Sequence, residues 1–411
     1  MRVLMVNTEY HRGGATRIAK TLHDALNTLP GHESLFAYGR GPTEQGSQAV
    51  RFALQPEVYL HAFITRLTGM QGYGTWLSTR RLLHLIRNWE PDVIHFHNIH
   101  GYYLDLSIAR AVGKLEIPVV WTLHDAWPLT GRCAYFFECN RWKSGCGHCP
   151  DLRSYPKTYF DTSRMMWRNK RKLLGGVWSS VIVTPSQWLG NLASEASAGQ
   201  YRLEVIANGI DTQLFRPRDH SEVRAELGLP DGKKVVLFAA ADLADERKGA
   251  RYFFECLNSV QANEWMAVTV GKKVDVRRML NRKVGIKQLG YIAGSEAMAK
   301  VYSAADLFCI TSLDDNFPTT VLESSACGTP VVGFRVGGIP EQVTDDCGIL
   351  VEPRDAQGLG RAITQLLQDD SLRESMSGNC RDRAVAEYSI SKFRDRYVKV
   401  YNRAIEGNRG P

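Results

Sequence analysis

The chain is organised around the stretch Asp306–Gly338, DLFCITSLDDNFPTTVLESSACGTPVVGFRVGG. It opens with a short apolar run over 307–310, which is typical of a strand buried on both faces of a sheet. After an acidic loop, Thr319 or Thr320 is expected to cap a helix, and a second apolar run follows over 331–334. The order strand, loop, helix, strand predicts one unit of a parallel sheet.

The helix of this unit is expected to begin at the carboxyl end of the sheet, where free N–H groups and the helix dipole favour an anion. Glu323 is expected in the first turn, where it suits the vicinal hydroxyls of a sugar better than a phosphate. These features suggest a ligand with both a ribose and a diphosphate. Two simpler roles fit the same residues: Asp315 as a helix cap, and Glu323 as a charge that offsets the dipole.

The stretch also resembles the acidic motif of the retaining glycosyltransferases of family 4. These enzymes have the GT-B fold, an α/β architecture of two Rossmann-like domains that face a cleft. Their motif places two acids with seven residues between them, and Asp315 and Glu323 hold these positions here. The runs 327–332 and 337–341, CGTPVV and GGIPE, match the segments that follow it. The resemblance implies that Glu323 binds the donor ribose and that Asp315 orients the donor sugar.

Two departures from the family motif change which groups are expected to meet the donor. Asp315 is one methylene shorter than the Glu that family members carry. Pro318 stands where many members have Gly, and it has no N–H to offer a phosphate. The backbone N–H groups of Thr319 and Thr320 are therefore expected to take that task.

Composition is that of an ordinary globular protein, because 44% of the residues are apolar and 23% are charged. The length of 411 residues is enough for two domains. The longest apolar run, 235–241, is too short to span a membrane. The first residues enter a strand pattern without a signal peptide, which predicts a cytoplasmic protein. The net charge of +8 suits an anionic substrate, an anionic membrane surface or a nucleic acid.

The first half of the chain alternates strand and helix patterns, which predicts a mostly parallel sheet in an acceptor-side domain over 1–207. The predicted strands are 3–7, 34–38, 93–97, 119–123, 181–184 and 203–206, and the predicted helices are 15–29, 76–88, 104–114 and 187–195.

Two features of this half stand where strands are expected to end. Gly13 and Gly14 precede the first helix and let the backbone approach a phosphate; in family 4 this loop contacts the donor. His124 ends the predicted strand 119–123. It resembles the family histidine that approaches the donor sugar, which makes it a candidate catalytic residue. His95 is expected to be an ordinary hydrogen-bonded histidine of the sheet.

The segment 130–152 breaks the alternation and carries four of the nine cysteines: Cys133, Cys139, Cys146 and Cys149. In a cytoplasmic chain this clustering is unusual for disulfides and typical of a tetrahedral zinc site. We expect a structural zinc, with unligated or redox-active thiols as the alternative, and no catalytic metal. The block 121–152 resembles a subgroup of family 4 related to colanic-acid and other polysaccharide glycosyltransferases.

The basic stretch 164–174, RMMWRNKRKLL, fits two interpretations. It is either a helix on an anionic membrane surface or a solvated face over an ordinary core stripe. On the first interpretation the protein is peripheral at the inner face of the membrane, and a lipid-linked acceptor, if that is the acceptor, is expected to bind near this helix.

The alternation of apolar and polar residues that marks strands and helices is lost over 206–217. The Asn-Gly and Arg-Pro pairs of this stretch resemble the linker between the two domains of family 4 enzymes. We expect a nucleotide-sugar-binding domain over 208–388, with 389–411 returning to the first domain. Its predicted strands are 235–239, 267–270, 287–290, 307–310, 331–334 and 348–351. Its predicted helices include 252–259, 359–367 and 371–388, the last capped by Ser371.

Arg247 and Lys248 follow the first strand of this second domain. In family 4 a basic pair near this loop clamps the donor diphosphate. Lys248, before Gly249, matches the family lysine, whereas the family arginine stands several residues earlier than Arg247. The resemblance also places Tyr291 in the loop that holds the nucleotide base.

These patterns predict transfer of a sugar, with retention, from a nucleotide-diphosphate donor to a hydroxyl of a glycan or lipid-linked acceptor. Two alternatives stay open: a nucleotide-sugar epimerase of the same fold, and an adaptor that binds nucleic acid through the cysteine segment. A dinucleotide oxidoreductase is not expected, because 12–16 lacks the Gly-x-Gly-x-x-Gly pattern. We expect no nucleic-acid partner. The sequence does not name the base, the sugar or the acceptor.

Overall fold

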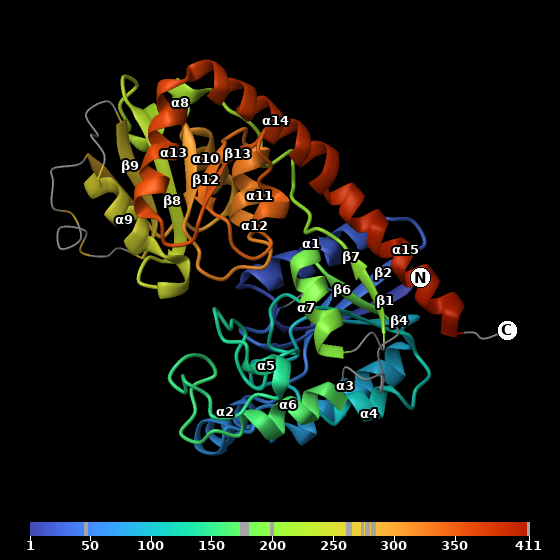
Figure 1. Ribbon diagram of the computed structural model, residues 1–411. Helices are drawn as coiled ribbons and strands as arrows, with labels where there is room; N and C mark the ends of the chain where they lie inside the picture. Colours follow the sequence, from blue (N-terminus) through green and yellow to red (C-terminus); the bar gives the residue numbers. More distant parts are fainter. Residues whose placement is uncertain are drawn as a thin grey trace. The chain divides into compact units, whose positions relative to one another are not determined.

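The computed structural model describes residues 1–44, 48–172, 181–197, 201–259, 265–272, 275, 280 and 285–408. The contacts divide the chain into two compact units: unit 1 is Met1–Gly209 with Ile390–Pro411, and unit 2 is Ile210–Ser389. The domain boundaries expected from the sequence lie within two residues of these bounds. Each unit is an α/β unit built on a parallel sheet, as Figure 1 shows.

Unit 1 contains a seven-stranded sheet in the order β3-β2-β1-β4-β5-β6-β7. The strand order reverses between β1 and β4, and such a switch point opens a crevice at the carboxyl ends of parallel strands. The strands are β1 (Arg2–Glu9), β2 (Glu33–Arg40), β3 (Ala49–Arg51), β4 (Val93–Phe96), β5 (Val119–Thr122), β6 (Val181–Thr184) and β7 (Arg202–Val205).

The helices of unit 1 are α1 (Gly14–Asn27), α2 (Gln55–Thr68), α3 (Trp76–Trp89), α4 (Ile108–Val112), α5 (Arg141–Ser144), α6 (Ser163–Lys172), α7 (Gln187–Ser197) and α15 (Ile390–Asn408). The helix predicted over 104–114 is too long, because only α4 forms there. The Asp105 carboxylate accepts a hydrogen bond from the N–H of Ser107 at 2.9 Å, and such local bonds compete with a helix.

Helix α15 completes the core of unit 1, although most of the chain separates it from the strands that it covers. The Tyr401 hydroxyl lies 2.7 Å from His95 Nδ1, and the Tyr397 hydroxyl lies 2.8 Å from Thr122 Oγ1. His95 Nε2 lies 2.8 Å from the same threonine hydroxyl. His95 is therefore a hydrogen-bonded histidine of the sheet, as expected, and burial holds its pKa well below the usual value.

Unit 2 contains a six-stranded parallel sheet in the order β10-β9-β8-β11-β12-β13, with its switch point between β8 and β11. The strands are β8 (Lys234–Asp242), β9 (Trp265–Lys272), β10 (Ile286–Gly290), β11 (Leu307–Ile310), β12 (Val331–Phe334) and β13 (Gly348–Val351). The helices are α8 (His220–Leu227), η2 (Glu246–Lys248), α9 (Ala250–Ser259), α10 (Ser295–Ser303), α11 (Thr319–Ala326), α12 (Ile339–Gln342), α13 (Ala356–Gln368) and α14 (Asp370–Tyr388).

The cap predicted for the long helix α14 is wrong. The helix begins before Ser371, and the Asp369 carboxylate accepts a hydrogen bond from the N–H of Leu372 at 2.9 Å. Aspartate is a strong N-cap residue, so the acid that comes first in the chain takes the position.

No helix in the described part of the chain is both long enough and apolar enough to cross a bilayer.

Candidate active site

Two loops meet at the switch point of unit 2. One contains η2 and follows β8, and the other follows β11. The N–H of Leu313 donates to the carbonyl of Arg247 at 2.8 Å, and the Thr311 hydroxyl donates to the carbonyl of Gly249 at 2.9 Å. These bonds fix η2 against the end of β11. The side chains of η2 therefore project from a backbone that is held in place.

Asp315 is the centre of this site. Its Oδ2 accepts hydrogen bonds from Lys248 Nζ at 2.6 Å, from Arg247 Nη1 at 3.2 Å and from the Ser312 hydroxyl at 3.1 Å. Burial alone would raise its pKa, but the Lys248 ammonium and the Arg247 guanidinium lower the pKa of Asp315 below its usual value. Asp315 is thus an ionised partner of two cations, and it does not serve as the cap of α11.

A glycine allows the chain to pass close to this acid. Gly337 has a φ of +58°, and a Cβ built there would lie 1.9 Å from the carbonyl oxygen of Asp315. Any larger residue would push the two segments apart. Gly337 therefore permits the close approach, and the N–H of Gly338 donates to the same carbonyl of Asp315 at 3.3 Å.

The cap predicted for α11 is wrong. Pro318 takes the cap position in extended backbone, and no side chain, including those of Thr319 and Thr320, makes a cap hydrogen bond. The N–H of Val321 already donates to the carbonyl of Pro318 at 3.2 Å. The first N–H groups of a helix have no partner within it, so those of Thr319 and Thr320, which are half-buried, point out of the helix end.

Glu323 lies in the second turn of α11, not in the first. The helix begins at Thr319, so Glu323 is its fifth residue. Its side chain is 2% exposed. Helix α11 thus holds this acid inside unit 2, behind the N–H groups of its first turn.

Tyr291 follows β10, the edge strand of the sheet, and lies two strands away from β8. Its side chain is 68% exposed. It shares the carboxyl edge of the sheet with Asp315, but the described contacts do not join it to the Asp315 cluster.

Unit 1 has a comparable arrangement at its own switch point. Gly13 is the N-cap of α1 with a φ of +104°, and a Cβ at Gly14 would meet nothing within 4 Å. Both glycines are exposed. The loop therefore leaves room for a ligand above the first N–H groups of α1.

His124, at the end of β5, pairs with His97, at the end of β4. His124 Nε2 lies 2.9 Å from His97 Nδ1, and the rings stack with centroids 5.2 Å apart. Burial lowers the pKa of His124 to about 4, and burial with the neighbouring histidines holds the pKa of His97 well below its usual value. Both rings are therefore neutral at pH 7, and each offers one N–H and one lone pair.

A second polar chain adjoins this pair. His100 Nε2 lies 2.9 Å from Asp125 Oδ2, and His100 Nδ1 lies 3.2 Å from the Tyr155 hydroxyl. Asp125 also accepts from the N–H of Trp127 at 2.9 Å, and its pKa is lowered despite burial by the charge and hydrogen bond of His100.

Two family models match the chain. A model described as Glycosyltransferase Family 4 matches residues 12–214, and one described as Glycosyl transferases group 1 matches residues 233–369. The chain belongs to the group 1, family 4 glycosyltransferases. The matched ranges contain the candidate site of each unit.

Named relatives agree with this assignment. The glycosyltransferase is 27% identical to WcaC of Escherichia coli K12, named for colanic acid biosynthesis, over 98% of this chain and 99% of WcaC. It is 25% identical to the MMP α-(1→4)-mannosyltransferase of Mycolicibacterium hassiacum, over 78% of this chain and 72% of that enzyme.

Solved structures show the GT-B fold. Sucrose-phosphate synthase from Thermosynechococcus elongatus aligns with a TM-score of 0.75 and 17% identity over 99% of both chains. HepE from Anabaena, solved in complex with UDP-glucose, aligns with a TM-score of 0.68 and 18% identity over 98% of this chain and 99% of HepE.

The candidate residues of the glycosyltransferase thus fall into two groups. The structure brings Arg247, Lys248 and Asp315 together in unit 2, and it brings His124 into contact with His97 in unit 1. Sequence reasoning missed the roles of His97, His100 and Tyr155. The repeated histidines that follow β4 were a signal for the first two.

Proposed function

We propose that this glycosyltransferase moves a sugar from a nucleoside-diphosphate donor to an acceptor hydroxyl, with retention, in the synthesis of a polysaccharide or glycoconjugate. The observation that carries the proposal is the pair of cations, Lys248 and Arg247, held by Asp315 at the switch point of unit 2. The full-length likeness to WcaC supports the polysaccharide setting.

The diphosphate is proposed to bind at the end of α11. The N–H groups of Thr319 and Thr320 point out of the helix there and suit phosphate oxygens, while Lys248 and Arg247 supply positive charge. Glu323, deeper in the same helix, is proposed to bind the ribose hydroxyls. UDP in the structure of HepE supports testing uridine nucleotides first.

The reaction places negative charge on the leaving diphosphate. The bond from the anomeric carbon to the diphosphate oxygen breaks, and the electron pair leaves with that oxygen. The acceptor hydroxyl oxygen bonds to the anomeric carbon on the same face, and its proton passes to the departing phosphate. Fixed cations and N–H groups stabilise this charge without a divalent ion.

A thermal-shift series with nucleotide sugars tests the donor assignment. We expect a nucleoside diphosphate to raise the melting temperature of the chain and Glu323→Ala to reduce that rise. An equal rise in melting temperature in Glu323→Ala would show that Glu323 does not bind the donor. Radiolabelled transfer then identifies the acceptor class, and the configuration of the product, read by NMR, tests retention.

Unit 1 also carries an exposed aromatic and basic surface, which we call the α2–α6 surface. On α2, Tyr59 is 67% exposed and Phe63 is 60% exposed. The segment that leads into α6 adds Tyr159, 59% exposed, and Phe160, 66% exposed. The two parts adjoin, because the N–H of Tyr159 donates to the carbonyl of Arg66 at 2.9 Å.

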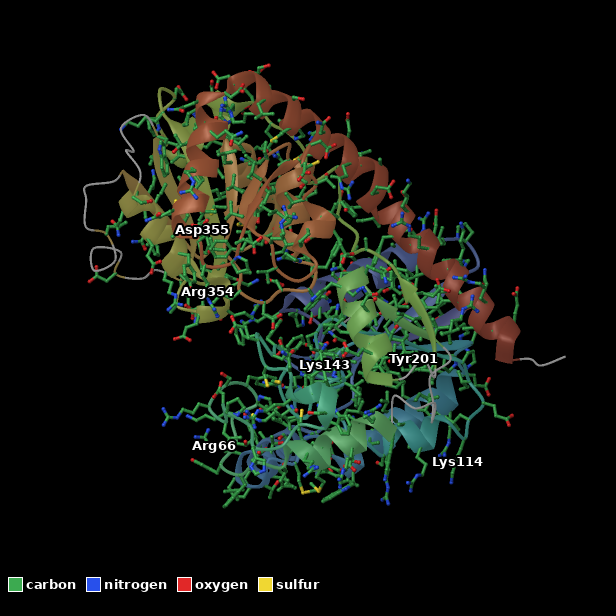
Figure 2. The ribbon with its side chains drawn as sticks, in the orientation of Figure 1. Arg66, Lys114, Lys143, Tyr201, Arg354 and Asp355 are labelled. Atoms are coloured by element: carbon green, nitrogen blue, oxygen red, sulfur yellow. The ribbon has the colours of Figure 1, made fainter. Side chains whose placement is uncertain are left out.

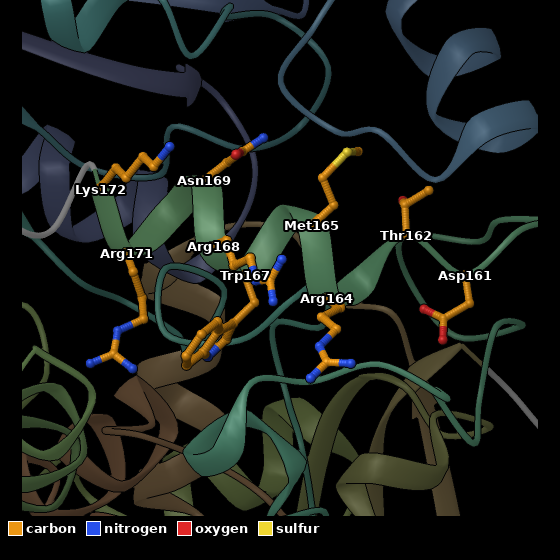
Figure 3. Close-up of a pocket in the computed structure, with 9 residues that line it drawn as sticks. All are labelled: Asp161, Thr162, Arg164, Met165, Trp167, Arg168, Asn169, Arg171 and Lys172. Carbon is orange, nitrogen blue, oxygen red and sulfur yellow. The ribbon is translucent and has the colours of Figure 1, made fainter.

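Cations border these aromatic rings. The Arg66 guanidinium, labelled in Figure 2, lies over the Tyr159 ring, 5.3 Å from its centroid. On α6, Arg164, Arg168 and Lys172 are exposed beside Met165. These side chains line a hollow of about 680 Å³, and Figure 3 shows them along α6. Aromatic rings with surrounding Arg and Lys match the boundary of an anionic bilayer.

We therefore propose that the α2–α6 surface binds anionic membranes and brings the enzyme to a lipid-linked acceptor. The test is co-sedimentation with vesicles of phosphatidylcholine alone or with phosphatidylserine. We expect binding only to the anionic vesicles, and its loss in Phe63→Ser with Arg164→Glu and Arg168→Glu. Arg354→Glu with Arg361→Glu, two exposed residues of unit 2, makes the control. Equal sedimentation of all variants would refute this surface.

The named relatives are transferases, which does not favour the epimerase or the nucleic-acid adaptor. Incubation of the donor without any acceptor separates the epimerase from the transferase. An epimerase would convert the donor sugar to its epimer under those conditions, and we expect no conversion.

A further inference from the structure

The cysteine segment of unit 1 is long and has little regular structure. Between β5 and α6 the only regular element in the described chain is α5, a helix of four residues. Long segments without secondary structure are uncommon in compact domains unless something other than a backbone ladder holds them. The segment Thr130–Leu152 thus needs a source of order beyond its own hydrogen bonds.

All four cysteines of this segment line one small cavity. Its volume is about 30 Å³, more than the roughly 10–15 Å³ that a cavity needs to hold one water molecule. The wall is formed by these thiols together with apolar and basic side chains: Cys133, Cys139, Cys146, Cys149, Phe136, Trp142, Arg132 and Arg141. His148 is not among the residues that line it. The cavity therefore has room for one ion among four sulfur atoms.

The backbone around Cys146 is shaped to present the sulfur atoms. Cys146, Gly147 and His148 have φ values of +52°, +94° and +50°, so the chain turns sharply between Cys146 and Cys149. The N–H of Gly131 donates to Cys146 Sγ at 3.1 Å. This N–H favours the thiolate, but burial outweighs it and raises the pKa of the Cys146 thiol to about 11, so a bound cation is needed to stabilise the thiolate.

A positive side chain reaches the same cluster. Arg132 is 5% exposed, and its Nη1 lies 3.9 Å from Cys149 Sγ. Four thiolates around a divalent ion leave two negative charges, which a buried guanidinium partly offsets. Its other hydrogen bonds go to backbone carbonyls such as those of Leu152 and Ser154, which anchor it in place.

We propose that Cys133, Cys139, Cys146 and Cys149 bind one structural Zn²⁺ that orders the segment. In the described part of the chain, no three His, Cys, Asp or Glu side chains already stand as a preformed metal site. On this proposal the four thiols move from the cavity wall onto the ion when it binds. Four sulfur ligands fill a tetrahedral shell, so the ion has no open position for catalysis.

Hydrogen bonds and an ion pair connect this segment to the start of α6 and to α7. The N–H of Cys149 donates to Asp161 Oδ2 at 2.7 Å, and the N–H of Gly147 donates to the Ser163 hydroxyl at 3.0 Å. Lys143 of α5, labelled in Figure 2, pairs with Glu195 of α7 at 2.9 Å. Loss of zinc is therefore expected to loosen the start of α6 as well as the segment itself.

The test measures zinc in the purified full-length chain by elemental mass spectrometry. We expect one zinc per chain, and less than a fifth of that in Cys146→Ser/Cys149→Ser. The matched control is Cys347→Ser/Cys380→Ser, which removes two cysteines of unit 2 that are joined by a hydrogen bond from Cys380 Sγ to the carbonyl of Cys347. This control is expected to retain the zinc.

A second measurement keeps the proposal testable if the double variant fails to fold. In the unmodified chain, we expect the four thiols to resist alkylation until a zinc chelator is added, and the melting temperature to fall with that chelator. A folded chain with four freely alkylated thiols, with disulfides, or with iron and sulfide in place of zinc would overturn the assignment.

Discussion

Lys248 Nζ lies 2.6 Å from Asp315 Oδ2, although 67 residues separate the two in the sequence. The contact joins the loops that follow β8 and β11. Between these two strands the strand order of the unit 2 sheet reverses. Asp315 thereby holds the ammonium in one place before any ligand arrives. A charge that is already positioned costs no reorganisation when the leaving group develops its own charge.

Replacement of Lys248 by alanine tests this arrangement. On the proposed function, we expect kcat/KM for sugar transfer to fall by about 100-fold, the usual effect of removing one preorganised charge donor. Affinity for a nucleoside diphosphate should fall far more than affinity for the monophosphate, because on the proposed function Lys248 contacts the second phosphate. Calorimetry with both nucleotides measures the difference.

Lys300→Ala is the matched control for this variant. Lys300 also holds an acid at 2.6 Å, that of Glu226, but on the exposed surface of α8 and α10. We expect its kinetics to equal those of the unmodified enzyme. Equal losses for the diphosphate and the monophosphate in Lys248→Ala would contradict a role at the second phosphate.

Asp315→Asn is expected to lower the free energy of unfolding of unit 2. The substitution removes the charge that two cations share, and a lost hydrogen bond between charged groups costs about 2 kcal/mol. Asp24→Asn removes a comparable contact, 2.8 Å from Lys20, on the exposed face of α1, and should cost less than about 0.5 kcal/mol. Urea unfolding of both variants gives the comparison.

The same acid predicts a pH dependence. The pKa of Asp315 is lowered in the folded chain, so its contribution to stability is complete above the usual carboxyl pKa and is lost as the pH falls below it. The difference in stability between the unmodified chain and Asp315→Asn should therefore shrink below about pH 4. A difference that stays constant down to pH 3 would contradict an ionised Asp315.

Gly337→Ala and Gly378→Ala are expected to act in opposite directions. Gly337 has a φ of +58°, and a Cβ there would lie 1.9 Å from the Asp315 carbonyl oxygen. We expect a loss of about 2 kcal/mol or more from strain and displacement. Gly378 lies within α14 with nothing within 4 Å of its Cβ position, so alanine should stabilise by about 0.5–1 kcal/mol. Thermal unfolding of the two variants tests the contrast.

The strands could be predicted most directly where their apolar runs are unbroken. The run 307–310 coincides with β11, which is buried on both faces. Helix α2 was missed for the opposite reason. Its outer face carries Tyr59, Leu60 and Phe63 where an ordinary surface helix would be polar, so no simple amphipathic pattern marks it.

The site could be predicted only in part. The carboxyl ends of strands pointed to Lys248, Asp315 and His124, but their partners depend on which strands are neighbours. Arg247 meets Asp315 because β8 pairs with β11, and His97 meets His124 because β4 pairs with β5. The helix start at Thr319 was missed because Pro318 replaces a side-chain cap.

Acid is expected to destabilise unit 1 more than unit 2. Burial lowers the pKa of His23, His61 and His124, all in unit 1, to about 4. In the unfolded chain these histidines bind protons near pH 6.5, whereas in the folded chain they stay neutral until the pH falls to about 4. Stability is therefore complete above about pH 6.5 and is lost as the pH falls toward 4, by up to roughly 1.4 kcal/mol per pH unit for each group.

His61 gives the sharpest test of this acid effect. Its Nε2 accepts a hydrogen bond from the N–H of Gly72 at 2.7 Å, so a proton on that nitrogen breaks the bond. Unit 2 has one histidine, His220. We expect hydrogen exchange, corrected for the intrinsic effect of pH, to rise in unit 1 first between pH 7 and 5. His61→Gln should reduce the pH slope of unit 1, and His84→Gln, at an exposed position of α3, should not. Parallel slopes in the two units would show that the buried histidines do not set the acid stability.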